Sequence, residues 1–535
     1  MKLPEPHVRA WYWYAFAAEV FAACAMAIFL PITLEQMARD IGFEAPDYTR
    51  PCSKVKPLPG TTPVACRAHI LGRWVDTASF SMYVKSIAVF MQALGIISIG
   101  TLADCAYWRK RLLVSFAVMG SATASLFLIL PGTPRPTLPV IGALITLVGN
   151  ITYAGSIVCA NAFLPGLARE DPAVVAARVA AENESGDEVE GGGLNEADAA
   201  SVAGSVILGV SEDNGEDEAL LTPSSLKYGE VLSRAMSRIS STGVAIGFFS
   251  GVAMLALLSV PVVLGGGSTR SLMLAVGLSA AWWGIFTIPA ARGLPGAAKV
   301  PAPAGWLPTA WRHIISMVHP AEIRRLPNLF TYLLAWIFLS DGFHTTTYTA
   351  ILYASSHLHM SPAKVIIIGL IMQLVAVGSS IYAPRLQRRL GLGNLRLLIY
   401  IVLAAQVLPL YACAGLVIRV GGLRTEAEMY VAAAWFGLLY GPFNSYARAV
   451  YAEMIPPGHE STFFSLFSLT DKSASFVGPL TVGLIADSTG NIRLGFVFLA
   501  VMLAIPVPVL MHVRVRRGVE EALAWSAERT EERQA

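Results

Sequence analysis

The sequence predicts an all-α membrane protein with twelve transmembrane helices in two bundles of six. Hydrophobic residues make up 55% of its 535 residues, charged residues only 14%, and the mean hydropathy is +0.57. A water-soluble domain usually carries about 25% charged residues, so this chain lacks the polar surface that a soluble fold needs. Apolar segments long enough to cross a bilayer, about 20 residues each, recur along the whole chain.

The twelve segments fall into two groups of six, separated by a polar stretch. In chain order, the predicted helices are 11–34, 77–102, 112–130, 138–164, 241–264, 271–291, 328–352, 365–383, 397–417, 429–454, 463–485 and 494–511. The division predicts an N-terminal bundle over 1–291, a cytosolic linker over 292–327, a C-terminal bundle over 328–512 and a cytosolic tail over 513–535.

Lys and Arg residues in the short loops predict the orientation, because such loops are enriched in these residues on the cytosolic side. Basic residues follow the second, sixth, eighth and twelfth helices, as Arg109, Lys110 and Arg111 follow the second. The first loop carries six basic residues on the opposite side and breaks the rule. The majority predicts that both termini lie in the cytosol.

Two loops stand out. The segment 166–238 is rich in Gly, Glu and Asp in its middle and poor in aromatic residues, which predicts a disordered cytosolic loop. The first loop holds Cys52 and Cys66, the only cysteines predicted to lie in a non-cytosolic loop. They are candidates for a disulfide, which would stabilise the fold by roughly 3 kcal/mol, and the alternative is two free thiols.

Ionisable side chains inside the predicted helices are the main candidates for function, because charges in the hydrocarbon region usually face a cavity or a partner. These residues are Glu19, Lys85, Asp341, His344, Arg448, Asp471 and Lys472. Glu19 and Lys85 lie at similar depths from opposite ends of their helices, so a structural ion pair between them is one interpretation. Contact of either residue with substrate or a proton is the other.

Polar residues also follow helical spacing. Asp341, His344, Thr345 and Tyr348 lie at i, i+3, i+4 and i+7, which places them on one face of a helix. Three further helices carry such a stripe. One contains Ser81 and Lys85, the second contains Asn444 and Arg448, and the third contains Ser468, Asp471, Lys472 and Ser475. Four such stripes predict a solute pathway, and helix-to-helix hydrogen bonding is the alternative for each one alone.

Asp341, with His344 one turn away, is a candidate proton site, because imidazole titrates near neutral pH. Protonation of either residue would couple solute movement to a proton gradient. Purely structural hydrogen bonding is the alternative.

Several strings resemble known families. Gly100, Asp104 and the basic run at 109–111 are similar to the signature between the second and third helices of the major facilitator superfamily. The chain as a whole resembles the fungal autophagy-related protein 22 family of vacuolar amino-acid effluxers, through the strings at 11–21, 31–36, 77–83, 162–165, 339–342, 445–448, 455–458 and 470–473.

The resemblance implies a major-facilitator-like fold in the vacuolar membrane. It also implies export to the cytosol of amino acids from autophagic degradation, such as leucine, isoleucine and tyrosine. Membrane lipid and small-molecule amino acids are the expected partners, with protons as a further candidate, and no nucleic acid is expected.

Other function classes have less support. No HExxH, P-loop or GxSxG string occurs, so we expect no enzyme and no cofactor. His357 and His359 are a lone pair of potential ligands, so we expect no metal site. The alternatives that stay open are a carrier for another small solute, such as a sugar or a peptide, and a non-transporting membrane sensor or scaffold.

Overall fold

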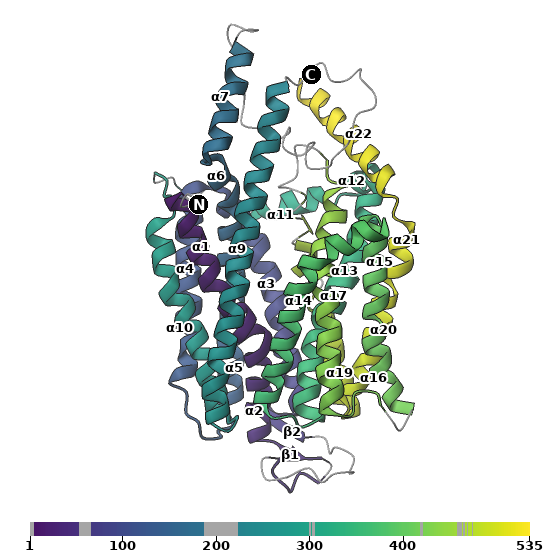
Figure 1. Cartoon of the computed structure of the whole chain (residues 1–535). Coiled ribbons are helices and arrows are strands. Elements are labelled where there is room, and N and C mark those ends of the chain that lie inside the picture. Colours follow the sequence, from purple (N-terminus) through teal and green to yellow (C-terminus); the bar gives the residue numbers. More distant parts are fainter. Residues whose placement is uncertain are drawn as a thin grey trace.

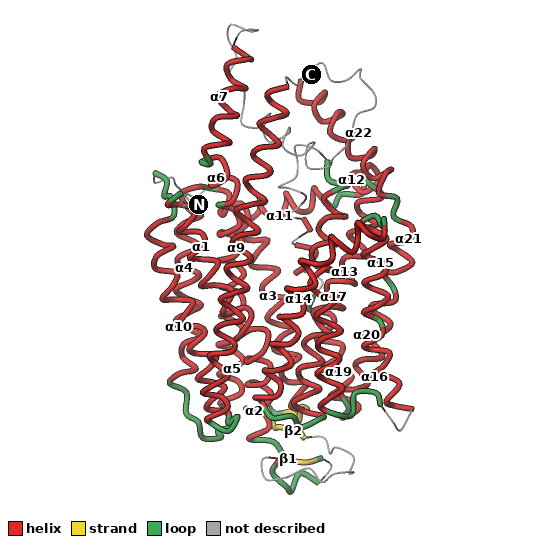
Figure 2. Tube along the Cα trace, in the orientation of Figure 1, coloured by secondary structure: helices red, strands yellow, loops and turns green. Residues whose placement is uncertain are grey.

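The computed structural model is a long bundle of helices (Figure 1). It describes residues 5–45, 47–52, 66–186, 223–298, 301, 305–417, 421–456, 463, 466–467, 469–472 and 475–534. Figure 2 shows that helices dominate and that strands occur at only one end of the bundle, which we call the hairpin end. The first and last helices of the chain begin and finish at the opposite end, which we call the terminal end.

The first helix contains the longest departure from regular α-helical geometry among the described residues. It runs as α1 (Pro6–Val20), a π-helical segment η1 (Phe21–Phe29) and α2 (Leu30–Asp40). The remaining elements of the first half are α3 (Thr77–Asp104), α4 (Ala106–Ser125), η3 (Leu126–Leu128), α5 (Leu138–Ala162), α6 (Leu164–Arg169), α7 (Pro172–Gly186), α9 (Pro223–Leu264) and α10 (Thr269–Gly293).

Two short helices, α11 (Trp306–Met317) and α12 (Pro320–Arg325), lie between the halves in the chain. The second half contains α13 (Pro327–Leu352), the π-helical η5 (Tyr353–His357), α14 (Pro362–Leu390), α15 (Asn394–Ala405), α16 (Val407–Val417), α17 (Glu426–Ala452), α19 (Val477–Thr489), η6 (Ile492–Leu494), α20 (Gly495–Ala504), α21 (Pro506–His512) and α22 (Val515–Gln534). In Figure 1 the helices of the two halves form two groups that lie side by side.

Nine stretches of the described residues are long and apolar enough to cross a membrane. The three predicted helices without such a stretch correspond to α13, α17 and the region of α19. α13 and α17 have 26 and 27 residues, enough to span a core about 30 Å thick at 1.5 Å per residue. They are less apolar than the other spans because they carry two of the polar stripes, and the count of twelve stays a prediction.

Close packing joins α1 to α9 through glycines. A Cβ added at Gly243 would lie 2.1 Å from Cζ3 of Trp11, and one added at Gly247 would lie 3.1 Å from Cβ of Glu19. A Cβ at Gly251 would lie 3.1 Å from Cβ of Ala23. The spacing of four residues therefore lets the two helix backbones approach closely, as small residues do in membranes.

The prediction that 166–238 is disordered is wrong at both ends of that segment. α7 covers 172–186, and α9 begins at Pro223, well before the predicted start at 241. Val174 and Ile239 are buried, and Asp171 forms an ion pair with Arg238, so α7 packs along α9. The acidic composition of the middle, 187–222, dominated the sequence average, and that part lies outside the described residues.

The first loop contains a small antiparallel sheet that an all-α prediction does not include. Its strands, in the order β1 (Phe43–Glu44), β2 (Cys66–Ile70) and β3 (Arg73–Asp76), form a sheet at the hairpin end. Leu71 and Gly72 join β2 to β3 with φ values of 50° and 81°, the left-handed pair that a tight two-residue hairpin needs. Cys52 and Cys66 form a disulfide with a Cα–Cα distance of 6.1 Å, which ties the start of β2 to the chain after β1.

Candidate functional site

A cluster of charged side chains lies between the two halves, where α3 and α13 meet the segment that precedes α19. Lys472 Nζ lies 2.8 Å from Asp471 Oδ2, and His344 Nε2 lies 3.9 Å from Asp471 Oδ1. The charge of Lys85, on α3, also acts on His344. The side chains of His344 and Lys472 are 42% and 36% exposed, so solvent reaches this charged cluster.

Two serines hold Asp471 in place. Ser340 Oγ donates a hydrogen bond to Asp471 Oδ1, and Ser475 Oγ donates to the backbone carbonyl of Asp471 at 2.5 Å. The two hydroxyl oxygens lie 3.4 Å apart. Ser340 was not a predicted site residue, because it lies beside Asp341 and about 100° away from the predicted polar face. Ser468, a predicted member of the same stripe, lies outside the described residues.

Asp341 occupies a different position from the charged cluster. It is 1% exposed, its Oδ2 accepts a hydrogen bond from the backbone N–H of Gly478 at 2.7 Å, and its Oδ1 accepts one from Thr345 Oγ1 at 2.9 Å. A Cβ at Gly478 would lie 2.2 Å from Thr345 Oγ1 and 2.5 Å from Asp341 Oδ1. Asp341 and Thr345 therefore fasten α13 to the start of α19, and Gly478 makes the close approach possible.

Tyr348 of α13 connects the two halves of the protein. Its hydroxyl lies 3.0 Å from Ser81 Oγ, and Ser81 Oγ in turn donates to the carbonyl of Pro31 at 3.1 Å. Lys85 Nζ lies 5.7 Å from the centre of the Tyr348 ring, within the range of a cation–π interaction. The phenol thus contacts α3 directly and is linked to α2 through Ser81.

Two predicted residues of α17 lie away from the charged cluster. Asn444 Nδ2 donates to the carbonyl of Tyr440 on its own helix at 3.1 Å, and Arg448 is exposed. The Tyr440 ring lies 6.4 Å from the His344 ring, so α17 reaches the cluster through Tyr440.

Glu19 and Lys85 form no ion pair within the described part of the chain. Glu19 packs against Gly247 of α9, whereas Lys85 faces Tyr348 across the boundary between the halves. Their similar depth did not bring them together, because the two side chains point toward different neighbours.

The hairpin end of the boundary between the halves is closed by polar contacts. Asp487 of α19 accepts a hydrogen bond at Oδ1 from the backbone N–H of Asp76 at 2.9 Å, and its carbonyl accepts one from Arg67 at 2.5 Å. Ser355 Oγ in η5 donates to Glu35 Oε2 of α2 at 3.1 Å. These contacts join the two halves at the hairpin end.

The pH dependence of stability should carry a contribution from Asp76, the N-cap of α3. Burial raises the pKa of this carboxyl from 3.8 to about 6, even though two backbone N–H groups of α3 lower it. Between about pH 4 and pH 6 the folded protein therefore binds more protons here than the unfolded chain does. The free energy of unfolding falls as pH rises through that window, by about 3 kcal/mol at most.

Thermal unfolding of the purified chain at pH 4 and pH 7 tests this contribution. The Asp76→Asn variant keeps a capping oxygen, but its side chain does not titrate. As the pH rises from 4 to 7, its melting temperature should therefore fall less than that of the wild type. Equal shifts in the two proteins would contradict the assignment.

Within the described residues, no group of three His, Cys, Asp or Glu side chains comes together to hold a metal ion. His357 stacks on the ring of Tyr353 with the ring centres 4.7 Å apart. The two arrangements that remain are the solvent-accessible charged cluster and the closed end beside it. Both lie at the boundary between the two halves.

Comparison with known proteins identifies the family and the fold. The family described as "Vacuole effluxer Atg22 like" matches residues 4–523. "Autophagy-related protein 22" of Cryptococcus neoformans var. neoformans is 55% identical, over 98% of this chain and 97% of the relative, and "Autophagy-related protein 22-1" of Penicillium rubens is 36% identical, over 97% and 92%. A D-xylose-proton symporter has a similar fold, with a TM-score of 0.56 at 12% identity over 96% of this chain and 99% of the symporter.

These matches confirm the predicted family, the major-facilitator-like fold and the expectation that the protein is a membrane transporter and not an enzyme. The strings that carried the resemblance run along the same length of chain that the family covers. The chain belongs to the vacuole effluxer Atg22-like family.

Proposed function

We propose that this chain exports large neutral amino acids, such as leucine, isoleucine and tyrosine, from the vacuolar lumen to the cytosol. The observation that carries the proposal is the charged cluster, where Asp471 lies between Lys472 and His344 at the boundary between the halves. A zwitterionic amino acid needs both signs of charge in its site. A carboxylate and an ammonium group within one solvent-accessible cluster meet that need.

The closed hairpin end supports transport by alternating access. Hydrogen bonds from Asp76 and Arg67 to Asp487 join the halves at the hairpin end. Breaking these bonds and closing the terminal end instead would expose the same cluster to the other side of the membrane. The basic residues of the short loops favour a cytosolic location for both termini, so we propose that the terminal end faces the cytosol.

Coupling to protons is part of the proposal, and we assign it to His344 in preference to Asp341. Both carboxylate oxygens of Asp341 accept hydrogen bonds in a buried site. His344 is 42% exposed and lies beside Asp471, so its imidazole can exchange protons with solvent and change the charge of the cluster.

Efflux from reconstituted liposomes tests the function. Purified protein in liposomes with an acidic interior should release preloaded leucine, isoleucine and tyrosine, and should retain glucose and a dipeptide. His344→Gln should remove the dependence on the pH difference while leaving exchange of amino acids across the membrane intact.

Two outcomes would reject the proposal. Release of the sugar or the peptide in place of amino acids would favour a different carrier. No release of any solute, together with loss of the cellular function on deletion of residues 181–220, would favour a scaffold that docks through its acidic segment.

A further inference from the structure

Lys85 of α3 places an ammonium group inside the membrane-embedded part of the protein without a carboxylate partner. It follows Thr77, the first residue of α3, by eight residues, roughly 12 Å along the helix. Among the described residues it forms no ion pair and no hydrogen bond. Its Nζ lies 5.7 Å from the centre of the Tyr348 ring, near the outer limit of about 6 Å for a cation–π interaction. Charges in the hydrocarbon region usually face a cavity or a partner, so the ammonium group of Lys85 is available to a ligand.

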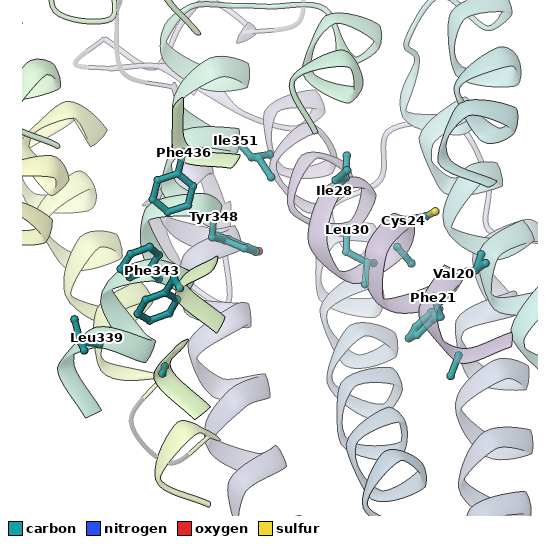
Figure 3. Close-up of a cluster of buried hydrophobic side chains, with 14 of the residues drawn as sticks. Val20, Phe21, Cys24, Ile28, Leu30, Leu339, Phe343, Tyr348, Ile351 and Phe436 are labelled. Carbon is teal, nitrogen blue, oxygen red and sulfur yellow. The ribbon is translucent and has the colours of Figure 1, made fainter. Parts of the chain in front are cut away.

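Lys85 and His344 lie at the same level of the boundary between the halves. α3 begins at the hairpin end and α13 begins at the terminal end, so the two helices run in opposite directions (Figure 1). The Tyr348 hydroxyl lies 3.0 Å from Ser81 Oγ, and Figure 3 shows the Tyr348 side chain pointing from α13 toward the side where Leu30 of the first half lies. About one helical turn from this contact toward the terminal end, four residues further on α3 and four residues earlier on α13, the chain reaches Lys85 and His344.

The charged cluster has an excess of positive charge. It contains two ammonium groups, those of Lys85 and Lys472, and one carboxylate, that of Asp471, which lies 2.8 Å from Lys472 Nζ. The charge of Lys472 acts on Lys85, and the two repel each other. Two other carboxylates are engaged elsewhere, because Asp341 accepts two hydrogen bonds in its buried site and Glu19 packs against α9. With a neutral imidazole, the cluster therefore carries one positive charge that no carboxylate of the cluster offsets.

A solute can reach this position from solvent. The side chains of His344 and Lys472 are 42% and 36% exposed, and Lys85 is itself partly exposed. The free ammonium group and the accessible surface thus occur together at the boundary between the halves.

We propose that Lys85 binds the carboxylate group of the transported amino acid. The inference rests on the proposed function and assigns the two charged ends of the substrate within the same site. The substrate's ammonium group lies against Asp471, and its carboxylate accepts a charge-assisted hydrogen bond from Lys85. The substrate thereby supplies the counterion that the helices around Lys85 do not provide. Amino acids with a free carboxylate are therefore favoured over amino-acid amides and esters.

Calorimetric titration of the purified full chain in detergent tests the assignment with three probes. These are leucine, leucinamide, which lacks the carboxylate, and N-acetylleucine, which lacks the ammonium group. Lys85→Met should raise the Kd for leucine and for N-acetylleucine at least about tenfold, which corresponds to about 1.4 kcal/mol. The Kd for leucinamide should change by less than about twofold, because this probe has no carboxylate for Lys85 to bind.

Two controls separate binding from folding. Lys364→Met removes the same charge from an ion pair with Glu426, 2.6 Å long, at the start of α14, and should leave all three Kd values within about twofold of those of the wild type. Without ligand, Lys85→Met should keep or raise the melting temperature, because it removes an ammonium group that has no counterion. A purely structural role predicts a lower melting temperature instead.

Three results would overturn the inference. The first is an unchanged Kd for leucine in Lys85→Met, and the second is an equal loss of affinity for leucine and leucinamide. The third is Lys85-dependent binding of chloride or phosphate that N-acetylleucine does not displace, which would assign the residue to an inorganic anion. Wild-type protein that bound none of the three probes would reject the proposed function, whereas leucine binding that did not depend on Lys85 would reject this inference alone.

Discussion

Replacing Asp471 with asparagine is expected to lower amino-acid transport at least about 30-fold. The substitution leaves the Lys472 ammonium, 2.8 Å from the lost charge, without a counterion inside the membrane-embedded part of the protein. Losing a hydrogen bond between the Asp471 carboxylate and the ammonium group of the substrate costs about 1.5–3 kcal/mol, and about 1.4 kcal/mol corresponds to a factor of ten. Efflux from liposomes measures the rate, and thermal unfolding in detergent measures the stability.

A double variant separates binding from structure. Asp471→Asn with Lys472→Met removes both charges, so no isolated ammonium is left and the melting temperature should recover toward that of the wild type. Transport should not recover if the two charges bind the zwitterionic substrate. Recovery of both properties would show that the pair is only structural.

Replacing Asp341 with leucine is expected to destabilise the fold by roughly 2–6 kcal/mol. The Gly478 N–H and the Thr345 hydroxyl both donate to this buried carboxylate, and each group left without a partner costs roughly 1–3 kcal/mol. Leucine also has little room here, because Gly478 packs so closely that a Cβ added to the glycine would lie 2.5 Å from Asp341 Oδ1. Thermal unfolding followed by tryptophan fluorescence measures the loss.

Thr346→Val provides the control on the same helix. Thr346 is fully buried, and its hydroxyl donates only within α13, to the carbonyl of Gly342, so this variant should lose less than about 1 kcal/mol. Wild-type stability of Asp341→Leu would contradict the role of Asp341 as an anchor. A loss of pH-driven transport in a stably folded Asp341→Asn variant would return Asp341 to the proton pathway.

The family and the fold were predictable because long apolar segments and short strings specify them with few alternatives. A bilayer demands about 20 apolar residues per helix, and most of the chain meets that demand. The sheet at the hairpin end was missed because its strands have only two to five residues each. Such short strands leave little alternation of apolar and polar residues to detect.

The site was predictable only in part, because helical spacing assigns residues to a face and one face can touch several neighbours. In the stripe on α13, Asp341 and Thr345 contact the start of α19, His344 points toward Asp471, and Tyr348 contacts Ser81 of α3. The helical spacing identified all four residues, but it did not predict which neighbour each side chain contacts. Gly478 carried no signal, since its importance lies in a close approach that exists only in the folded protein.

The π-helical segments have a consequence for comparing this protein with its relatives. η1 interrupts the first helix over nine residues, and η5 continues α13 over five, so the leading helix of each half contains wide turns with i to i+5 hydrogen bonds. A wide turn accommodates one more residue than an α-helical turn. The side chains beyond it therefore point in directions rotated from those of an uninterrupted α-helix. Gain or loss of a single residue within η1 would reorient Glu35 and the rest of α2 as a unit, which makes these turns the places where related chains can differ in length without breaking a helix.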